Sequence, residues 1–194
     1  MKNICVYCGS SAGKSPVYRQ AAQNLARELV ARDLGLVYGG ASVGLMGELA
    51  NTVLALGGRA VGVIPTRLAL KEVAHEGLDE LIVVDSMHER KATMEKLSDG
   101  FIALPGGWGT LEEIFEILTW AQLGLHEKPC GLLNIEGYYD HLGAFLKHAQ
   151  DQRFVREVYS SIVMMESEPA ALLDRFGNYE APHVQKWITA TEET

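Results

Sequence analysis

Short runs of aliphatic and β-branched residues alternate with segments of helical periodicity along most of this chain. Such alternation predicts an α/β fold in which a doubly wound parallel sheet carries helices on both faces. Strands are expected over 3–8, 34–40, 59–65, 80–85, 100–107 and 129–134, and helices over 16–32, 44–56, 86–98, 110–124 and 139–150. A further strand over 161–167 and a short helix over 169–176 fit the same pattern. Ligands of such sheets bind at the carboxyl ends of the strands, near the point where the strand order reverses.

Composition narrows the class of protein. A chain of 194 residues with 47% hydrophobic and 22% charged residues suits one globular domain, here 1–194, with a frayed tail from about residue 181. No apolar run reaches membrane-spanning length and no secretory leader is recognisable, so we expect a cytoplasmic protein without a membrane partner. The net charge of −8 argues against nucleic acid as a partner, although backbone dipoles could still hold a small anion.

The three cysteines are an odd number for a disulfide framework. Cys5 and Cys8 lie in one expected strand, where alternation directs them to opposite faces. Reduced structural thiols are therefore preferred over a redox pair. No histidine or cysteine stands at ligand spacing from His88, so neither a metal site nor a cofactor is predicted.

Two glycine-rich segments imitate nucleotide-binding motifs. "GSSAGKS" at 9–15 has three residues rather than four before its Gly-Lys pair, which disfavours a Walker-type phosphate loop. Gly9 and Ser10 could still face a phosphate or ribose, or the segment could be an ordinary turn between a strand and a helix. "YGGASVGLMG" at 38–47 has Ala41 where the dinucleotide fingerprint needs its second glycine, so hydride transfer is disfavoured.

The segment "LPGGWGTLEE" at 104–113 indicates an anion site. It follows an apolar strand and opens a strongly patterned helix, so the backbone N–H groups from Gly106 to Thr110 and the positive helix end converge on one spot. The glycines let the main chain approach a ligand without Cβ atoms in the way. We therefore expect an anion to bind this loop.

Glu113 in the same segment has two interpretations. With Thr110 as the N-cap it could complete a capping box and serve only its own helix. Alternatively, a carboxylate held beside an anion site could stabilise a developing positive charge. Chemistry at the anomeric carbon of a ribose phosphate would need both features.

Projected at ~100° per residue, the helix over 110–124 has two apolar sides. The side expected to face the sheet comprises Leu111, Ile114, Phe115, Leu118 and Gln122. Glu113 falls opposite, and a second apolar surface comprises Ile117, Trp120 and Leu123. That surface predicts either a partner helix from an identical subunit or cover by the C-terminal segment of the same chain.

The segment "DSMHERKATMEK" at 85–96 supplies cationic side chains. Asp85 or Ser86 can cap a helix here, and Arg90 and Lys91 then lie in its first turns, where the helix dipole disfavours positive charge. This location favours a functional role over a merely solvated face. Arg90 can make forked contacts with a phosphate, a ribose or a leaving base.

Six stretches, "CGSS", "LVYGGASVGLMG", "GVIP", "MHERK", "FIALPGGWGTLEE" and "TWAQLGLHEKPCGLLN", together resemble the Lonely guy (LOG) family of cytokinin riboside 5′-monophosphate phosphoribohydrolases. The similarity runs from about residue 3 to about residue 175, and the pairing of "RK" with "PGGxGTxxE" is highly specific. The resemblance implies a Rossmann-like homodimer that hydrolyses AMP or an N6-modified AMP to the free base and ribose 5-phosphate.

On matching positions, the resemblance makes Arg90 and Glu113 the catalytic pair. Glu113 would polarise water or stabilise the ribosyl cation, and Arg90 would orient the nucleotide and favour charge leaving with the base. Substrate contacts are implied at Glu72, Lys91, Gly107, Trp108, Gly109, Thr110, Leu111, Glu112 and Thr119, to which the loop after the first strand adds Gly9 and Ser10.

Two other functions compete with hydrolysis. A nucleotide-binding sensor would keep the pocket without the chemistry, but it would need no carboxylate beside the phosphate cradle. Proteins of this kind are often labelled lysine decarboxylases, yet the chain has no typical pyridoxal-phosphate Schiff-base signature. The hydrolase is therefore the preferred prediction.

Overall fold

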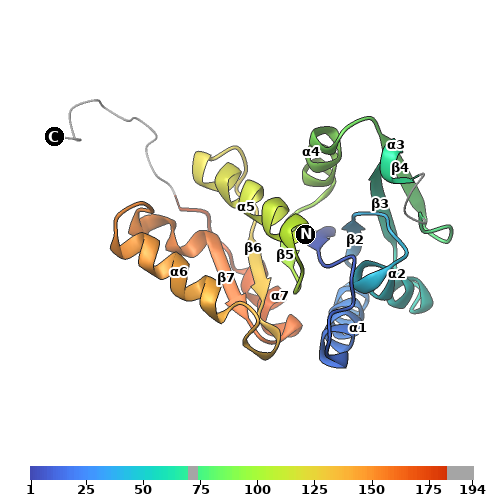
Figure 1. The fold of residues 1–194 in the computed structure, drawn as a ribbon, viewed down its shortest axis with the longest axis horizontal. Coiled ribbons are helices and arrows are strands. Elements are labelled where there is room, and N and C mark those ends of the chain that lie inside the picture. Colours follow the sequence, from blue (N-terminus) through green and yellow to red (C-terminus); the bar gives the residue numbers. More distant parts are fainter. Residues whose placement is uncertain (70–73, 183–194) are drawn as a thin grey trace.

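A computed structural model describes residues 1–69 and 74–182 of the chain. Within these residues one parallel sheet of seven strands has the order β4-β3-β2-β1-β5-β6-β7 (Figure 1). The strands are β1 (Asn3–Tyr7), β2 (Gly35–Tyr38), β3 (Ala60–Pro65), β4 (Glu80–Val84), β5 (Gly100–Ala103), β6 (Cys130–Leu133) and β7 (Val163–Glu166). The doubly wound fold predicted from the sequence is confirmed, including the added last strand.

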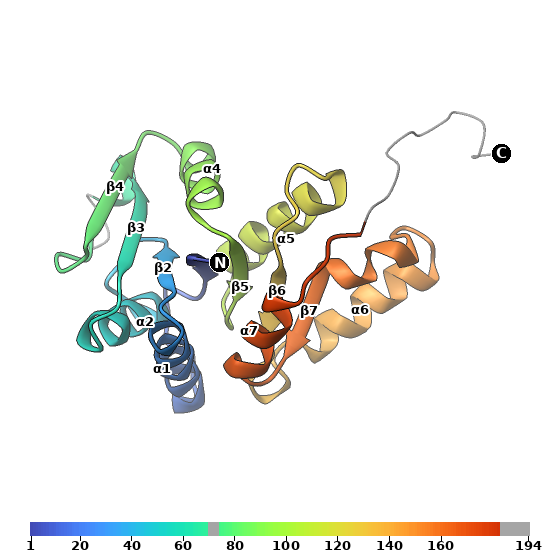
Figure 2. The ribbon, with the colours of Figure 1, turned by 180° about the vertical axis from the view of Figure 1, so that it is seen from behind.

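Helices cover both faces of the sheet. The longer ones are α1 (Pro16–Ala31), α2 (Gly44–Ala55), α4 (Met87–Leu97), α5 (Trp108–Leu123), α6 (Asp140–Asp151) and α7 (Pro169–Gly177); short turns are α3 (Thr66–Ala69), η1 (Ile135–Gly137) and η2 (Glu157–Ile162). In both ribbon views α4 and α5 lie on the opposite side of the strands from α1 and α2 (Figures 1 and 2). None of the described helices is long and apolar enough to cross a membrane.

Strand alternation divides the core into two layers. Ile4 and Val6 of β1 join the apolar cluster under α1, α2 and α7, whereas Cys5 joins the cluster under α4, α5 and α6. Cys8 belongs to the first cluster, so the two neighbouring cysteines point to opposite faces as predicted. Both are buried, free thiols, as is Cys130.

The strand order reverses beside β1. From β1 the chain proceeds outward through β2 and β3 to β4, and then crosses back through α4 to β5 on the other side of β1. Ile4 of β1 is in register with both Leu36 of β2 and Gly100 of β5. The loops after β1 and β5 therefore diverge at one place, which is where such sheets bind ligands.

The helix that follows β5 begins two residues earlier than its sequence predicts, and it buries a different set of side chains. α5 begins at Trp108 with Gly107 as the N-cap, so Thr110 lies inside the helix. Its buried residues are Thr110, Glu113, Ile114 and Ile117. The expected inward side is confirmed in part: Ile114 is in the core cluster, and Leu111, Phe115 and Leu118 are partly buried against it. Gln122 is exposed, and Ile117, expected on the other surface, belongs to the core. Part of the remaining surface lies against η2 of the same chain.

His126, just after α5, is a buried neutral histidine. Its Nε2 donates to the carbonyl oxygen of Ile117 at 2.9 Å, and its Nδ1 accepts from the N–H of Lys128 at 3.1 Å. These partners define one neutral tautomer. Burial lowers the pKa of His126 below the usual 6.5.

We expect the melting temperature to fall as the pH drops below 6.5, the usual histidine pKa. In that range His126 is protonated in the unfolded chain but stays neutral in the folded protein. Acidification therefore stabilises the unfolded state relative to the folded one. Thermal melts of the wild type and of His126→Gln between pH 8 and pH 5 measure the effect. The variant should melt lower at pH 8 but lose less on acidification, and equal slopes would contradict the assignment.

Candidate active site

Three loops meet at the carboxyl ends of the central strands. The N–H of Gly9, after β1, donates to the carbonyl of Pro105, after β5, at 3.2 Å. The N–H of Leu45, after β2, donates to the carbonyl of Gly9 at 3.0 Å. A Cβ added to Gly44 would lie 2.3 Å from the Ser10 carbonyl group, so only glycine lets these loops pack so closely.

A hollow of about 260 Å³ opens where the loops after β1 and β5 face each other. Its walls include Gly9, Ser10, Gly106 and Gly107. The first N–H groups of α5 lie at the same place, and in a helix these have no carbonyl partner of their own. The arrangement offers backbone donors and a positive helix end to an anion, as the sequence predicted.

Two tyrosines that sequence reasoning missed complete this hollow. The Tyr138 hydroxyl donates to the carbonyl of Gly106 at 2.7 Å, which fixes the orientation of that peptide. The Tyr18 ring meets the Tyr138 ring edge-on, with 5.8 Å between centroids. Tyr18 and Tyr138 both lie outside the motifs that indicated the site, Tyr18 three residues after the glycine-rich segment at 9–15.

Arg90 reaches the same end of the sheet from α4. The helix starts where predicted, because the Ser86 hydroxyl accepts from the N–H of Glu89 at 3.1 Å. Arg90 is only 8% exposed, and its Nε donates to the carbonyl of Val63 in β3 at 3.0 Å. The guanidinium is therefore anchored to the sheet rather than free in solvent.

Arg90 and Glu113 form a buried ion pair. Arg90 Nη1 lies 3.2 Å from Glu113 Oε1, and both side chains are about 10% exposed. Burial raises the pKa of Glu113 above the usual 4.5, and the charge of Arg90 only partly opposes that rise. A carboxylate with a raised pKa is a stronger base than an ordinary glutamate.

The capping-box interpretation of Glu113 is wrong. The N-cap of α5 is Gly107, and no side chain caps this helix. Glu113 instead contacts a cation from another helix. The backbone amide of Leu111 is also unavailable to an anion, because its N–H already donates to the carbonyl of Gly107 at 3.1 Å.

Lys91 joins the two helices that carry the ion pair. Its Nζ lies 2.6 Å from Glu112 Oε1 and 3.0 Å from Glu116 Oε1, both on α5. Burial alone would lower the pKa of Lys91, but the two carboxylates outweigh it and the pKa is raised. The ammonium thus holds α4 against α5 and fixes the spacing between Arg90 and Glu113.

Other predicted contacts are dispersed. Trp108 is 90% exposed at the start of α5, beside the hollow. Thr119 lies six residues beyond Glu113, about 9 Å along the helix, and its hydroxyl donates to the carbonyl of Phe115 at 2.7 Å. Gly109 has open space around it. Glu72 and the tail beyond residue 182 lie outside the described residues.

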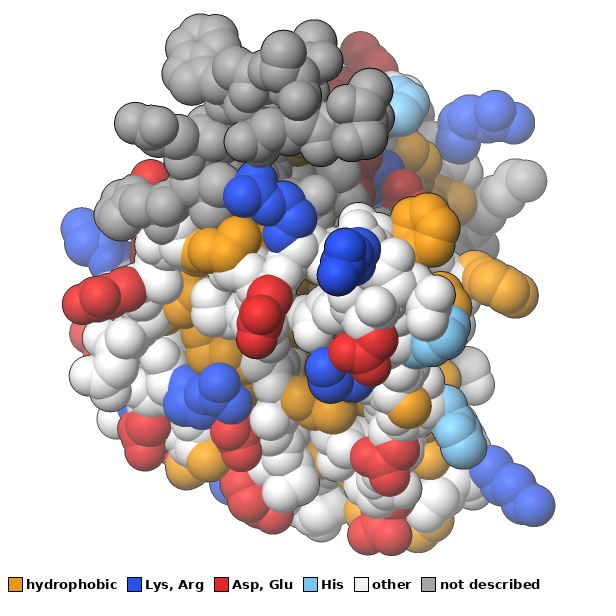
Figure 3. Space-filling view, turned by 90° about the vertical axis from the view of Figure 1, so that its left-hand side faces the viewer, with side chains coloured by type: hydrophobic (Ala, Val, Ile, Leu, Met, Phe, Trp, Pro, Cys, Tyr) orange, Lys and Arg blue, Asp and Glu red, His pale blue; other side chains and the backbone are white. Residues whose placement is uncertain are grey.

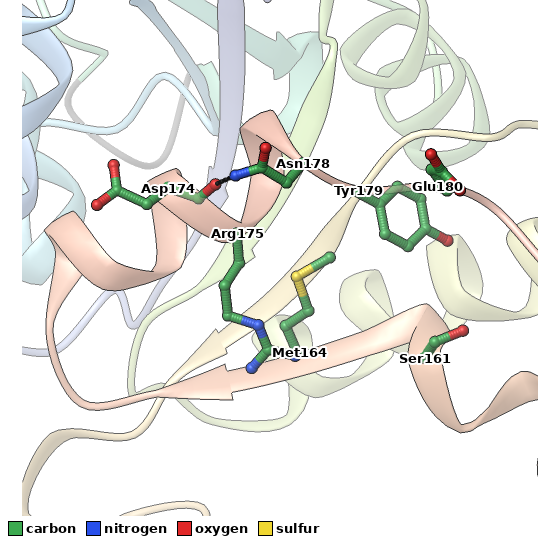
Figure 4. A pocket seen from close by; sticks show the side chains of 7 residues that line it. All are labelled: Ser161, Met164, Asp174, Arg175, Asn178, Tyr179 and Glu180. Carbon is green, nitrogen blue, oxygen red and sulfur yellow. Dashed lines mark hydrogen bonds between the residues drawn. The ribbon is translucent and has the colours of Figure 1, made fainter.

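A second hollow, of about 400 Å³, lies at the opposite end of the sheet (Figure 4). It sits where β7 begins and α7 ends, and two of its polar side chains bond within the protein. Asn178 donates to the carbonyl of Asp174 at 2.9 Å, and Arg175 pairs with Glu166 at 2.6 Å. Its location at the amino ends of the strands makes it a poor candidate. The described residues include no group of three or more His, Cys, Asp or Glu side chains arranged to hold a metal ion.

Known proteins share both sequence and fold with this chain. A family model described as "Possible lysine decarboxylase" matches residues 46–176. The rice (Oryza sativa subsp. japonica) protein LOGL9, named a probable cytokinin riboside 5′-monophosphate phosphoribohydrolase, is 51% identical over 178 residues, covering 92% of this chain and 78% of the relative. The chain belongs to the LOG family. LOG5 of Arabidopsis thaliana, named a cytokinin riboside 5′-monophosphate phosphoribohydrolase, is 49% identical over 92% of this chain and 78% of that protein.

Solved structures with the LOG-type fold include more distant proteins. The molybdenum cofactor binding protein of Rippkaea orientalis matches with a TM-score of 0.69 at 23% identity, covering 92% of this chain and 97% of that one. A molybdenum cofactor carrier protein of Chlamydomonas reinhardtii matches with a TM-score of 0.68 at 20% identity, covering 91% and 96%. At these identities the likeness shows the shared fold alone.

The decarboxylase description of the family model does not suit this LOG site. A lysine that forms a Schiff base must present a deprotonated amine. Lys91, the lysine that is buried beside the ion pair, is held by two carboxylates that favour its charged form. The lysine at this site is therefore committed to an ionic contact.

Proposed function

We propose that this LOG protein is a nucleoside 5′-monophosphate phosphoribohydrolase acting on AMP or an N6-modified AMP. The observation that carries the proposal is the buried contact at 3.2 Å between Arg90 and Glu113, which lies on the helix that begins at the glycine loop. The curated LOG relatives, named as cytokinin riboside 5′-monophosphate phosphoribohydrolases, support the reaction class.

The reaction breaks the bond between the purine N9 and the ribose C1′. The base leaves with the bonding electrons and takes up a proton, and a water oxygen adds to C1′ after losing a proton, giving the free base and ribose 5-phosphate. Amides of the glycine loop hold the 5′-phosphate, and the ribose then lies toward α4. Glu113 stabilises positive charge at C1′ and directs the water, while Arg90 orients the nucleotide.

The substrate contacts implied by the family resemblance remain part of this proposal. Thr110, Gly109 and Gly9 support the phosphate, and Trp108 offers its exposed ring to the base. Lys91 and Glu112 contribute through the link between α4 and α5, whose ammonium-carboxylate distance is 2.6 Å. The contact with Thr119 and that with Glu72 extend the site along α5 and beyond the described residues.

Incubation with AMP and isopentenyl-AMP, followed by chromatography of the free base, tests the proposal. Release of adenine or its N6-substituted form, with equimolar ribose 5-phosphate, is expected. Adenosine should react far more slowly, because it lacks the phosphate that the loop holds. Tight nucleotide binding without base release would instead favour a sensor, and a lack of both would refute the assignment.

The variant Gly107→Ala tests whether the substrate phosphate binds the glycine loop after β5. An ideal Cβ there meets no atom within 4 Å, so Gly107→Ala should leave the melting temperature of the protein unchanged. The added methyl should crowd the bound phosphate and raise KM about 10- to 100-fold, as for the loss of one charge-assisted hydrogen bond. Gly177→Ala at the end of α7 also meets no atom within 4 Å and is the matched control. Equal KM values for both variants would refute this position of the phosphate.

A homodimer is also part of the proposal. Leu123 and Leu125 at the end of α5 are 55% and 69% exposed, and Phe145 of α6 and Phe154 are 63% and 87% exposed. Apolar side chains of this size in water commonly mark a subunit contact. Sedimentation measures the subunit number.

On the face shown in Figure 3, acidic and basic side chains are interspersed among apolar ones, so its described residues offer no concentrated positive field to a polyanion.

We also propose a cytoplasmic location, because the three buried free thiols suit a reducing compartment.

A further inference from the structure

The segment "YGGASVGLMG", which does not fit a dinucleotide fingerprint, has another use in this fold. Gly39 is buried at the carboxyl end of β2, where the guanidinium of Arg90 lies against it. A Cβ added to Gly39 would stand 2.2 Å from Arg90 Nη2 and 3.0 Å from Met46 Sδ. The first distance is far shorter than any van der Waals contact, so a side chain here and the guanidinium cannot occupy their places together.

The backbone does not require glycine at this position. The glycines with positive φ include its neighbour Gly40, at 77°, but not Gly39. An L-residue could therefore adopt the conformation of Gly39 without strain. The three nearest atoms that its Cβ would meet, two of the Arg90 guanidinium and the sulfur of Met46, belong to side chains and not to the backbone. The missing side chain at position 39 leaves space for the Arg90 guanidinium, and the backbone conformation does not require it.

The guanidinium is fixed on three sides. Nε donates to the carbonyl of Val63 at 3.0 Å, Nη1 contacts Glu113 at 3.2 Å, and Nη2 lies over the bare backbone of Gly39. Because the guanidinium is planar and rigid, displacement of Nη2 rotates or shifts Nη1 as well. A side chain on Gly39 would thus separate Arg90 from Glu113 without touching either the substrate loop or the carboxylate.

We infer that Gly39 is a positioning residue, whose missing side chain seats the Arg90 guanidinium so that it meets Glu113. The role of that pair in hydrolysis rests on the proposed function. The position of the Arg90 guanidinium over Gly39, called the seat below, is a property of the folded protein and can be tested without turnover.

A double-mutant cycle tests the inference through the reaction. Gly39→Ala alone should lower kcat for base release about 100-fold, as expected for a misplaced catalytic group, and should also lower the melting temperature, because Glu113 stays buried without its cation. Arg90→Lys removes the planar group, so adding Gly39→Ala to that variant should change kcat less than about twofold. Equal losses from Gly39→Ala in both backgrounds, or no loss in either, would overturn the inference.

Two further glycine variants distinguish an effect on the position of Arg90 from an effect on folding. Gly40→Ala should lower the melting temperature, because this residue has a φ of 77° and its Cβ would lie 3.2 Å from Leu81. Gly177→Ala should change neither stability nor kcat. If Gly39→Ala lowered the melting temperature as much in the Arg90→Lys background as in the wild type, the residue would be structural and the inference would fail.

A crystal structure of Gly39→Ala keeps the two proposals distinguishable. If the wild type releases no base from any nucleotide, the proposed function fails but the seat can still be examined. Separation of Arg90 Nη1 from Glu113 beyond hydrogen-bonding distance, with β2 and α4 unmoved, is the expected result. An unchanged contact beside the new methyl group would overturn the inference.

Discussion

Glu113→Gln should lower kcat for base release by about 10³-fold while nucleotide still binds. The amide keeps the size of the side chain and its place on α5, but it carries no negative charge for C1′ and cannot accept a proton from water. Binding depends mainly on the phosphate loop, so the dissociation constant for AMP should change little. Single-turnover rates and calorimetric titration on the same preparation measure both quantities.

The control for this variant is Glu127→Gln, which removes a carboxylate that is exposed and lies beyond the end of α5. It should keep wild-type activity. In the wild type, kcat/KM should fall on the acid side as Glu113 becomes protonated, with a midpoint above the usual glutamate pKa of 4.5 because burial raises the pKa of this carboxyl. Retention of more than a tenth of the wild-type kcat by Glu113→Gln would rule out the assigned role.

Arg90→Ala should abolish base release and also destabilise the protein. The change leaves Glu113 buried without its cation, and breaking a buried pair on one side costs about 3 kcal/mol or more. The pKa of Glu113 should rise further, because burial then acts without opposition. Denaturant unfolding at two pH values and steady-state assays measure the two effects.

The stability loss offers an internal check on Arg90→Ala. If it arises from the uncompensated Glu113 carboxylate, Arg90→Ala combined with Glu113→Gln should recover part of the lost unfolding free energy but none of the activity. An additive loss of stability in the double variant would show that the two side chains do not interact in solution.

The fold followed from the sequence because parallel strands buried on both faces read as continuous apolar runs. The strands and the longer helices could be located, the cap of α4 could be limited to Asp85 or Ser86, and the glycine loops could be assigned to the carboxyl ends of strands. Such features depend on local pattern and on a general rule of sheet topology.

The orientation of α5 could not be predicted in the same way. Hydrophobic periodicity assigned Leu111 and Phe115 to the sheet and Glu113 to the opposite side. The helix instead buries Glu113, because a cation from α4 meets it there at 3.2 Å. A buried charge is stabilised by a partner distant in sequence, and no periodicity records that partner.

The glycines show a similar limit. Spacing identified the loop at 106–109, because its chemistry is carried by consecutive backbone groups. The seat of Arg90 at Gly39 depends on a side chain 51 positions later, which a motif comparison cannot detect. The ion pairs of Lys91 with Glu112 and Glu116 likewise join two helices distant in sequence, and no spacing indicated them.

A crystal structure of Glu113→Gln with bound AMP would test the account most directly. We expect the phosphate to accept hydrogen bonds from the amides at 107–110, and the side chain at position 113 to face C1′ with room for one water. A nucleotide whose phosphate lies elsewhere, or whose C1′ faces away from position 113, would contradict the proposed hydrolysis.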